Sequence, residues 1–510
     1  MGRFPTSDRG AEVALVTCGL GLAVVLVRSA WVADDAFITL RTVDNFVRGY
    51  GLTWNPSERV QAYTHPLWMF VLSAGYAFTR EPFYTTVALS FALNTLAVLL
   101  FICRLARTTR GAILGIVVLL VSKAFVDYSV SGMENPLSHL LIALFLWAYF
   151  ERDESQRTTL LLFGIASLAL VNRLDAAVFY FPPLACRLWR FGSRKSLSVV
   201  AAGFAPLILW ECFSLLYYGF PIPNTAFAKL TTGIPTSAMI HQGLRYLADS
   251  LQTDPVTLPA IVTGVALPFL LRDRDAIPVG IGVLFHLLYV VWIGGDFMSG
   301  RLLSLPLFCT VILIARCEWG RLRSWAVALA LALVLGMRAP FPTILCGSDF
   351  GSYGDDPIGA HGIADERRFY FQYAGLLNMG KRLEEHPWAS RGIWAREENV
   401  QVMVYYTVGY FGFFAGQGVH IVDPFGVADP LLSKIPVDDP NWRIGHFRRE
   451  VPSGYVESLA SDRNLIEDPR LAEYYDRLRS VTRGRLLDPD RLSAIWHVNV
   501  RERYPLLPEK

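Results

Sequence analysis

Long apolar stretches separated by short charged loops dominate the first two thirds of the chain. Twelve of them approach the length of a membrane-spanning helix, which needs about 20 apolar residues. They are residues 11–32, 65–80, 83–103, 111–130, 137–150, 158–172, 176–190, 197–216, 256–271, 276–293, 301–316 and 324–341. The first lacks a small-residue cleavage site and ends near Trp31, a typical interface anchor. We therefore expect it to be an uncleaved span.

Arginine-rich loops indicate the orientation of these spans. They cover residues 104–110, 151–157, 187–195, 272–275 and 316–323. The positive-inside rule places such loops in the cytoplasm. Residues 33–64, 131–136, 172–175, 217–255 and 294–300 then face outward, together with the C-terminal part of the chain.

The predicted orientation constrains the number of crossings. An N-terminus inside and a C-terminal domain outside require an odd number, so we expect about eleven spans. The exception falls near residues 65–110: either one of the stretches 65–80 and 83–103 is re-entrant, or the loop at 104–110 departs from the positive-inside rule.

Composition agrees with a membrane protein. Of 510 residues, 53% are hydrophobic and 18% are charged, with a mean hydropathy of +0.35. Soluble domains carry about 25% charged residues, so a disordered chain and an ordinary cytosolic enzyme are excluded. The net charge of +3 is too small to indicate nucleic-acid binding. The seven cysteines form no CxxC pair, which excludes a zinc ribbon and a disulfide framework.

Charge becomes dense after residue 341. We predict a polytopic α-helical membrane domain over residues 1–341, followed by an outer-face mixed α/β soluble domain over 342–510. The pattern favours strands at 400–408 and 419–423 within the second domain.

The segment after the first span carries an adjacent acidic pair, Asp34 and Asp35. Acids at a membrane boundary are costly and are usually functional. The alternative is a solvated pair, or one that binds Arg41. An apolar stripe along residues 37–47 predicts an amphipathic helix lying on the membrane surface.

Three stretches in the first 140 residues resemble a known superfamily. They are DDAFITLRTVDN, GYGLTWNPSERVQAYT and SGMENPL. They are similar to the GT-C glycosyltransferases, and within these to the terminal β-(1→2)-arabinofuranosyltransferases of mycobacterial cell-wall synthesis. The rest of the chain agrees mainly in layout.

The resemblance implies a fold, a reaction and a location. The enzyme would take a sugar, D-arabinofuranose, from a polyprenyl-phosphate donor and transfer it to a cell-envelope glycan or another outer-face acceptor. It would be a multi-pass protein of the bacterial plasma (inner) membrane, with its active site facing the periplasm or cell exterior. Its partners would be the donor lipid, the acceptor and the bilayer, without nucleic acid.

Two other classes of function remain open. A related bacterial group associated with flagellar or envelope functions shares the signature, so the chain could be a non-catalytic accessory protein. A transporter of lipid or sugar would need polar residues near mid-membrane. The ionisable residues here lie at the outer ends of the spans, which favours an enzyme.

Glycosyl transfer needs a carboxylate that takes a proton from the acceptor, and positive charge or a metal at the leaving phosphate. The resemblance implies that Asp34 or Asp35 contacts the acceptor, and we favour Asp35 as the base. The candidates for the phosphate are Arg173, Arg301, Lys229 and Arg41, and those for lining the site are Glu134, Asp175, Asp296, Tyr63 and His65.

Each candidate also has a structural interpretation. Glu134 could complement a helix dipole, Arg173 and Asp175 could form an ion pair, and Asp296 could cap a helix. Lys229 could be a rim lysine, and His65 could simply pack. Nothing matches a nucleotide-binding motif. No cofactor is required by the sequence, and a divalent cation remains possible.

Overall fold

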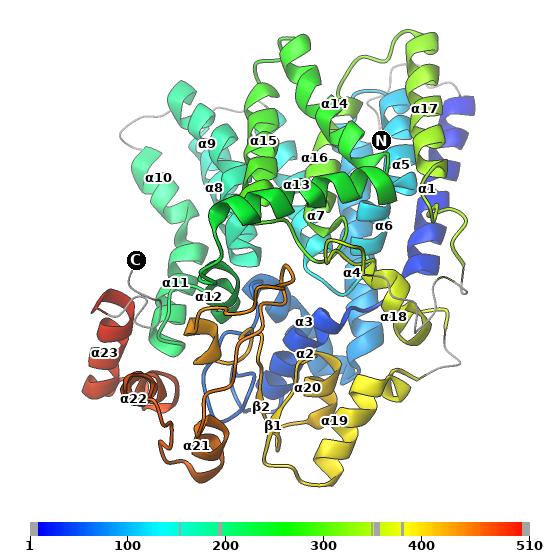
Figure 1. Cartoon of the computed structure of the whole chain (residues 1–510). Coiled ribbons are helices and arrows are strands. Elements are labelled where there is room, and N and C mark those ends of the chain that lie inside the picture. Colours follow the sequence, from blue (N-terminus) through cyan, green and yellow to red (C-terminus); the bar gives the residue numbers. More distant parts are fainter. Residues whose placement is uncertain are drawn as a thin grey trace. The chain divides into compact units, whose positions relative to one another are not determined.

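The computed structural model describes residues 9–151, 155–191, 196–347, 350, 358–378 and 382–501. Parts of the predicted loops 151–157 and 187–195 lie outside these residues. The chain divides into two compact units, each built from several segments (Figure 1). Unit 1 is Met1–Ala33, Thr86–Pro206 and Thr236–Gly380, and unit 2 is Asp34–Thr85, Leu207–Pro235 and Lys381–Lys510. The predicted boundary at 341/342 separates membrane from outer-face parts and stays a prediction.

Unit 1 is a helical bundle. Its elements are α1 (Arg9–Ser29), most of α4 (Pro82–Leu100), η1 (Phe101–Leu105), α5 (Thr109–Val121), α6 (Lys123–Tyr128), α7 (Asn135–Phe150), α8 (Gln156–Asn172), η2 (Leu174–Ala176), α9 (Ala177–Phe191), α10 (Ser196–Gly203), α13 (Thr236–Thr253), α14 (Thr257–Leu270), α15 (Ile277–Trp292), η3 (Arg301–Leu303), α16 (Ser304–Ala315), α17 (Leu322–Met337) and α18 (Glu366–Ala374). Each predicted apolar stretch of this unit contains a helix.

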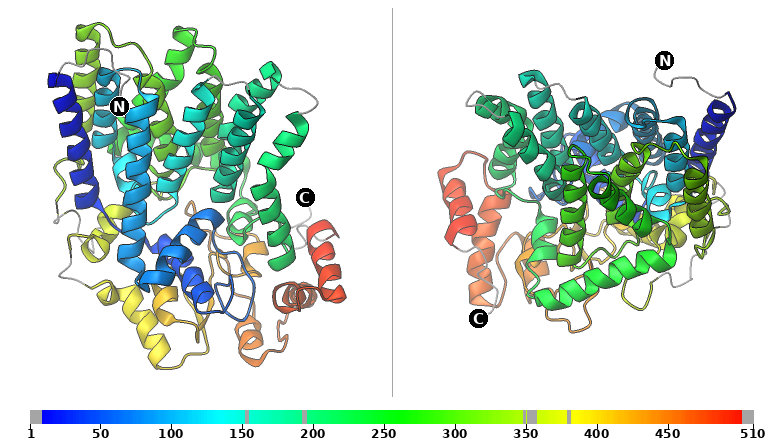
Figure 2. Two further views of the ribbon diagram at one scale, coloured as in Figure 1. Left: turned by 180° about the vertical axis from the view of Figure 1, so that it is seen from behind. Right: turned by 90° about the horizontal axis from the view of Figure 1, so that it is seen from above.

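Among the described residues, Arg9–Ser29 and Pro82–Leu105 are long and apolar enough to cross a membrane. Two bent helix pairs raise the number to four if each pair counts as one span. One of these pairs is α13 with α14, bent by 108°, and Figure 2 shows α13 along its length in the view from above. Most other apolar helices are shorter, so the count of about eleven spans stays a prediction.

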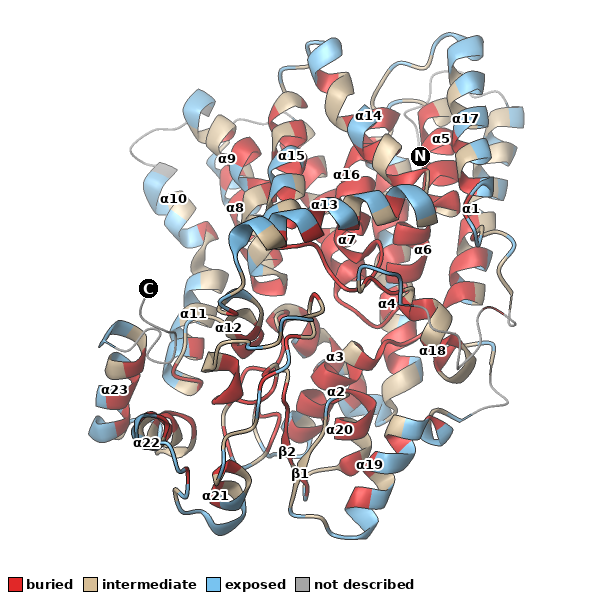
Figure 3. Cartoon of the chain, in the orientation of Figure 1, coloured by how far each residue is buried: buried red, intermediate tan, exposed pale blue. Residues whose placement is uncertain are grey.

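The outer helices of unit 1 expose apolar side chains. On α1, Val13, Val16, Leu20 and Val24 are each 61–66% exposed and recur every three or four residues. In contrast, α16 is buried at all twelve positions (Figure 3). A continuous exposed apolar stripe is unfavourable in water but suits contact with lipid. The bundle is therefore a membrane-embedded helical structure.

Small residues let the inner helices approach closely. A Cβ on Gly264 of α14 would lie 2.4 Å from the Thr310 Cβ of α16. A Cβ on Gly282 of α15 would lie 2.2 Å from the Phe179 carbonyl oxygen of α9. Such contacts replace the hydrophobic driving force that is missing between helices in lipid.

Unit 2 combines short helices with a small sheet. Its elements are α2 (Asp34–Val47), α3 (Pro66–Thr79), most of α11 (Ala205–Tyr217), α12 (Asn224–Leu230), η4 (Leu383–Glu385), α19 (Pro387–Glu397), β1 (Val402–Val404), α20 (Tyr410–Ala415), β2 (His420–Val422), η5 (Leu432–Lys434), α21 (Tyr455–Ser461), α22 (Pro469–Arg483), α23 (Pro489–Trp496) and η6 (His497–Arg501).

The sheet of unit 2 has two parallel strands. Val402 lies opposite His420, and Val404 opposite Val422, with α20 in the connection between the strands. The strand predicted at 400–408 is therefore shorter than expected, and the one predicted at 419–423 is confirmed in its central residues. A crossover helix between parallel strands is the usual β-α-β arrangement.

The helix predicted at 37–47 is present as α2, and its predicted location on the membrane surface stays a prediction. Eleven of its 14 residues are buried. It contacts both α3 and α20. The Phe37 ring lies edge-on to the rings of Tyr410 and Phe413, at centroid distances of 5.0 and 5.2 Å. Three of its buried polar side chains, Asp34, Arg41 and Asn45, bind the backbone of neighbouring loops.

Candidate functional site

Five charged residues of unit 1 form one continuous ion network. Glu134 lies at its centre: Oε1 is 2.6 Å from Nη1 of Arg173 and 3.2 Å from Nη2 of Arg301. Arg173 also binds Asp175 through two nitrogens, with Nε 2.9 Å from Oδ1. Arg301 reaches Asp296 at 3.4 Å. The residues therefore alternate in sign, in the order Asp175, Arg173, Glu134, Arg301 and Asp296.

Helix ends position four members of this network, and Asp296 lies in the loop between α15 and η3. Glu134 precedes α7, where Pro136 sets the first turn. Arg173 ends α8 and Asp175 follows in η2. Arg301 begins η3. Three chain segments thus meet near helix ends, which is the arrangement the sequence predicted from polar residues at the ends of apolar stretches.

The network is buried, but part of the Arg173 side chain is exposed. Glu134 is fully buried and the Arg301 side chain is 7% exposed, whereas that of Arg173 is 21% exposed. Burial raises the pKa of Asp175, but the charge and hydrogen bonds of Arg173 outweigh it and the pKa is lowered overall. The network contains three acids and two arginines.

Two amides that the sequence analysis did not single out support the network. Nδ2 of Asn172 donates to the Glu134 carbonyl oxygen at 3.4 Å and to Oγ of Ser138 at 2.9 Å. Nδ2 of Asn135 donates to the Arg301 carbonyl oxygen at 3.4 Å. Both amides are next to charged residues at the ends of apolar stretches in the sequence, and this position could have identified them as site residues.

A buried tyrosine holds the loop that carries Asp296 and Arg301. The Tyr246 hydroxyl of α13 donates to the Met298 carbonyl oxygen and accepts from the Leu302 N–H, both at 3.1 Å. A Cβ on Gly295 would lie 2.5 Å from Tyr246, so the ring packs directly on the loop backbone. Tyr246 lies within an amphipathic stretch, which gives no signal for this role.

In unit 2 the acidic pair separates into two environments. Asp34 is buried, and its carboxylate accepts hydrogen bonds from the N–H groups of Tyr410 at 2.6 Å and Gly409 at 3.2 Å. A Cβ on Gly409 would lie 1.9 Å from the Asp34 carbonyl oxygen, so only glycine fits there. Burial raises the pKa of Asp34 to about 7, although the two backbone hydrogen bonds lower it.

Asp35 is half-buried, unlike its neighbour. Adjacent residues on a helix point about 100° apart, so Asp34 and Asp35 face different surroundings. The Asp34 carboxylate is thus buried against the backbone of residues 409 and 410, whereas the Asp35 side chain is partly exposed.

Arg41, a predicted phosphate ligand, binds backbone carbonyl groups of its own unit. Its guanidinium is buried and donates to the carbonyl oxygens of Trp54 at 2.8 Å, Val419 at 3.0 Å and Gly412. It also reaches Oδ1 of Asn55 at 3.4 Å and lies 4.6 Å from the Trp54 ring centroid. Burial lowers its pKa to about 9. These contacts join α2 to the loops that flank the sheet.

The three other predicted site residues of unit 2 are Tyr63, His65 and Lys229. The buried Tyr63 hydroxyl lies 2.8 Å from that of Tyr218, and burial raises its pKa. His65 is buried, with Nε2 2.8 Å from the Thr39 hydroxyl, which fits the packing role considered for it. Lys229 is half-buried in the last turn of α12.

Among the described residues, no group of three or more His, Cys, Asp or Glu side chains is arranged to hold a metal ion. The three acids of the network, Glu134, Asp175 and Asp296, are each paired with an arginine, so their oxygens already have cationic partners.

Two curated proteins are similar in sequence to this chain. Both are named terminal beta-(1->2)-arabinofuranosyltransferase. The one from Mycobacterium tuberculosis is 29% identical over 68% of this chain and 63% of its own length. The one from Corynebacterium glutamicum is 27% identical over 70% of this chain and 57% of its own length. The predicted resemblance to these transferases is confirmed.

The chain spans about 60% of the length of these relatives. No model of a known protein family matches it. Two solved structures of ArnT from Cupriavidus metallidurans are distantly similar to this chain. The one bound to undecaprenyl phosphate has a TM-score of 0.41 and 14% sequence identity, and the match covers 83% of this chain and 77% of that one. The one in the apo state has a TM-score of 0.42 and 16% identity, and the match covers 82% of this chain and 76% of that one. Likeness at this level supports no inference about ligands.

Proposed function

We propose that the chain is a membrane glycosyltransferase that moves a sugar, D-arabinofuranose, from a polyprenyl phosphate to an envelope glycan on the outer face of the plasma membrane. The observation that supports this most directly is the arginine pair held by Glu134. One carboxylate holds two guanidiniums in place at helix ends, and guanidinium geometry suits phosphate oxygens. The relatives described above carry out transfer of the same kind according to their names.

Arg173 is the member of the pair best placed to accept a phosphate. It engages Asp175 and Glu134 through three nitrogens, and its side chain retains 21% exposure. Arg301 is more deeply buried and orients Glu134 from the other side. We assign binding of the donor phosphate to Arg173, assisted by Arg301. Positive charge at this position stabilises the phosphate as it leaves.

Asp35 supplies the base. Its carboxylate removes the proton from the acceptor hydroxyl as the hydroxyl oxygen attacks the anomeric carbon of the donor sugar. The bond between that carbon and the phosphate oxygen breaks, and its electron pair leaves with the polyprenyl phosphate. Asp34 does not take this role, because its oxygens accept hydrogen bonds from Gly409 and Tyr410.

The experiment is transfer of labelled sugar from a polyprenyl phosphate to an arabinan acceptor by the purified full chain. Asp35→Asn keeps the size of the side chain and removes the base, so we expect the rate to fall by about 10²–10⁴-fold. The yield from membranes should equal that of the unmodified protein. Asp35→Glu, which restores a carboxylate, should recover part of the rate.

Full activity in a protein carrying both Asp34→Asn and Asp35→Asn would contradict an acidic base in this pair. Absence of transfer by the unmodified protein from any polyprenyl-phosphate sugar, despite binding of the lipid, would favour an accessory role instead.

A further inference from the structure

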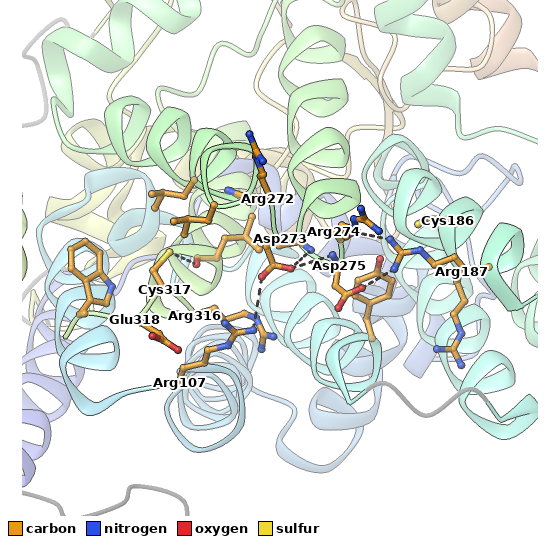
Figure 4. A pocket seen from close by; sticks show the side chains of 18 of the residues that line it. Arg107, Cys186, Arg187, Arg272, Asp273, Arg274, Asp275, Arg316, Cys317 and Glu318 are labelled. Atoms are coloured by element: carbon orange, nitrogen blue, oxygen red, sulfur yellow. Dashed lines mark hydrogen bonds and ion pairs between the residues drawn. The ribbon is translucent and has the colours of Figure 1, made fainter. Parts of the chain in front are cut away.

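Unit 1 contains a second polar region, a cavity of about 1020 Å³ lined by six arginines. Among the described residues these are Arg107, Arg187, Arg190, Arg272, Arg274 and Arg316, against three acids, Asp273, Asp275 and Glu318. The arginines come from four separate loops or helix ends (Figure 4). These loops are the ones that the sequence predicted to face the cytoplasm.

Three helices connect the ion network around Glu134 with this cavity. At the network, α7 begins after Glu134, α9 after Asp175 and α16 after Arg301. At their other ends lie Tyr149, Arg187 and Arg316, which line the cavity. With 12 to 16 residues and a rise of 1.5 Å per residue, these helices separate the two regions by roughly 20 Å. The cavity is therefore distinct from the proposed transferase site.

Two of the three acids of the cavity, Asp273 and Asp275, are already engaged. Asp275 binds Nη1 of Arg190 at 2.7 Å, and Asp273 lies 3.8 Å from Nη2 of Arg107. Oδ1 of Asp273 also accepts from the N–H groups of Asp275 and Ala276. Among the described residues, the side chains of Arg272 and Arg274 have no acidic partner, and both are exposed. The cavity thus carries uncompensated positive charge at one edge.

We propose that this cavity binds a phosphate group. Guanidinium pairs bind phosphate oxygens bidentately, and basic pockets between helices on the cytoplasmic side of a membrane suit lipid head groups. The volume is ample for a head group. Leu267 and Leu271 line the same cavity, and Leu271 is 60% exposed, so an acyl chain can extend from it along apolar surface. A free phosphate would use the same arginines without the apolar path.

The test is a binding titration of the purified full chain in neutral maltoside detergent. The probes are dioleoyl phosphatidylglycerol, dioleoylglycerol (the same lipid without phosphate) and inorganic phosphate, followed by native mass spectrometry for the lipids and calorimetry for phosphate. We expect saturable binding of phosphatidylglycerol and none of dioleoylglycerol. Saturable binding of inorganic phosphate at comparable affinity would identify a free phosphate as the source.

Two matched double variants locate the binding. Arg272→Gln/Arg274→Gln removes the two uncompensated charges of the cavity. Arg321→Gln/Arg323→Gln removes two exposed charges from the same predicted side but outside the cavity lining. All four side chains are exposed, so folding should persist, which thermal unfolding would verify.

We expect the cavity variant to weaken binding of the phosphate-bearing probe by about tenfold or more, and the control variant by less than about twofold. The affinity should also fall as salt rises. Equal weakening by both variants, or no saturable binding of either phosphate-bearing probe, would overturn the assignment.

Discussion

Both units bury charged side chains, but they satisfy them in different ways. In unit 1 charge is paired with charge: the Glu134 carboxylate binds two guanidiniums that come from distant segments of the chain. In unit 2 the buried Glu58 has an arginine nearby, 3.6 Å away, but Asp34 and Arg41 are paired with backbone. Asp34 accepts from the N–H groups of residues 409 and 410, and Arg41 donates to three carbonyl oxygens.

This difference separates groups that can change partners from groups that cannot. A guanidinium that binds a carboxylate can exchange part of that contact for a substrate phosphate while the backbone stays in place. A carboxylate that binds two backbone N–H groups can release them only if the local structure opens. Buried charge in unit 1 is therefore suited to ligand binding, whereas Asp34 and Arg41 in unit 2 stabilise the fold.

The largest loss of stability is expected when Glu134, the acid at the centre of the unit 1 network, is replaced. Glu134→Gln removes the charge that Arg173 and Arg301 share, and breaking a buried ion pair costs about 3–5 kcal/mol. Denaturant titration in detergent micelles would measure the loss of unfolding free energy. The control is Asp275→Asn, which removes an acid whose side chain is 30% exposed from its pair with Arg190. We expect the control to cost less than about 1 kcal/mol, and equal losses would contradict the importance of the network.

The next largest loss of stability is expected when Arg41 loses some of its hydrogen bonds to backbone carbonyl groups. Arg41→Lys keeps the charge but replaces a planar fork with a single ammonium group. The carbonyl oxygens of Trp54, Gly412 and Val419 cannot all be reached by one ammonium, so we expect a loss of about 2–3 kcal/mol. Lipid-donor binding should not change. A selective loss of donor binding with unchanged stability would instead restore Arg41 as a phosphate ligand.

The sequence predicted the unit 1 network better than the unit 2 contacts, for a physical reason. Polar residues at the ends of apolar helices on one side of a membrane are brought near one another by the helices themselves, so Glu134, Arg173 and Arg301 could be named. Apart from the Trp54 carbonyl, the backbone partners of Asp34 and Arg41 lie at residues 409–419, more than 370 positions along the chain. Any residue has an N–H and a carbonyl, so such partners leave no pattern in the sequence.

A smaller effect concerns Asp34 and pH. Its pKa is raised from about 4 in the unfolded chain to about 7 in the fold, by burial. The folded state therefore holds the proton more tightly, so this contribution to stability is full below about pH 4 and is lost as pH rises to about 7. Asp423, whose pKa burial raises to about 6, adds to the same trend.

Asp34→Asn should flatten this part of the pH dependence. It should also cost about 1–2 kcal/mol at neutral pH, because one of two backbone N–H groups loses its acceptor. Unfolding free energies at pH 5 and pH 7 for both proteins would measure the change. An unchanged slope in the variant would show that Asp34 is not the group responsible.

The smallest effect is expected at Asp44, an acid of unit 2 that binds both a charged side chain and neutral side chains. Asp44 binds Arg48 at 2.8 Å, but it also accepts from the Tyr76 hydroxyl at 2.7 Å and from Nε2 of Gln417 at 2.5 Å. The Arg48 side chain is 54% exposed. Arg48→Ala should therefore cost only about 0.3–0.5 kcal/mol, as for exposed pairs one helical turn apart. A loss above about 1 kcal/mol in the same denaturant titration would mean that ion pairs also stabilise unit 2, and the contrast between the two units would then not hold.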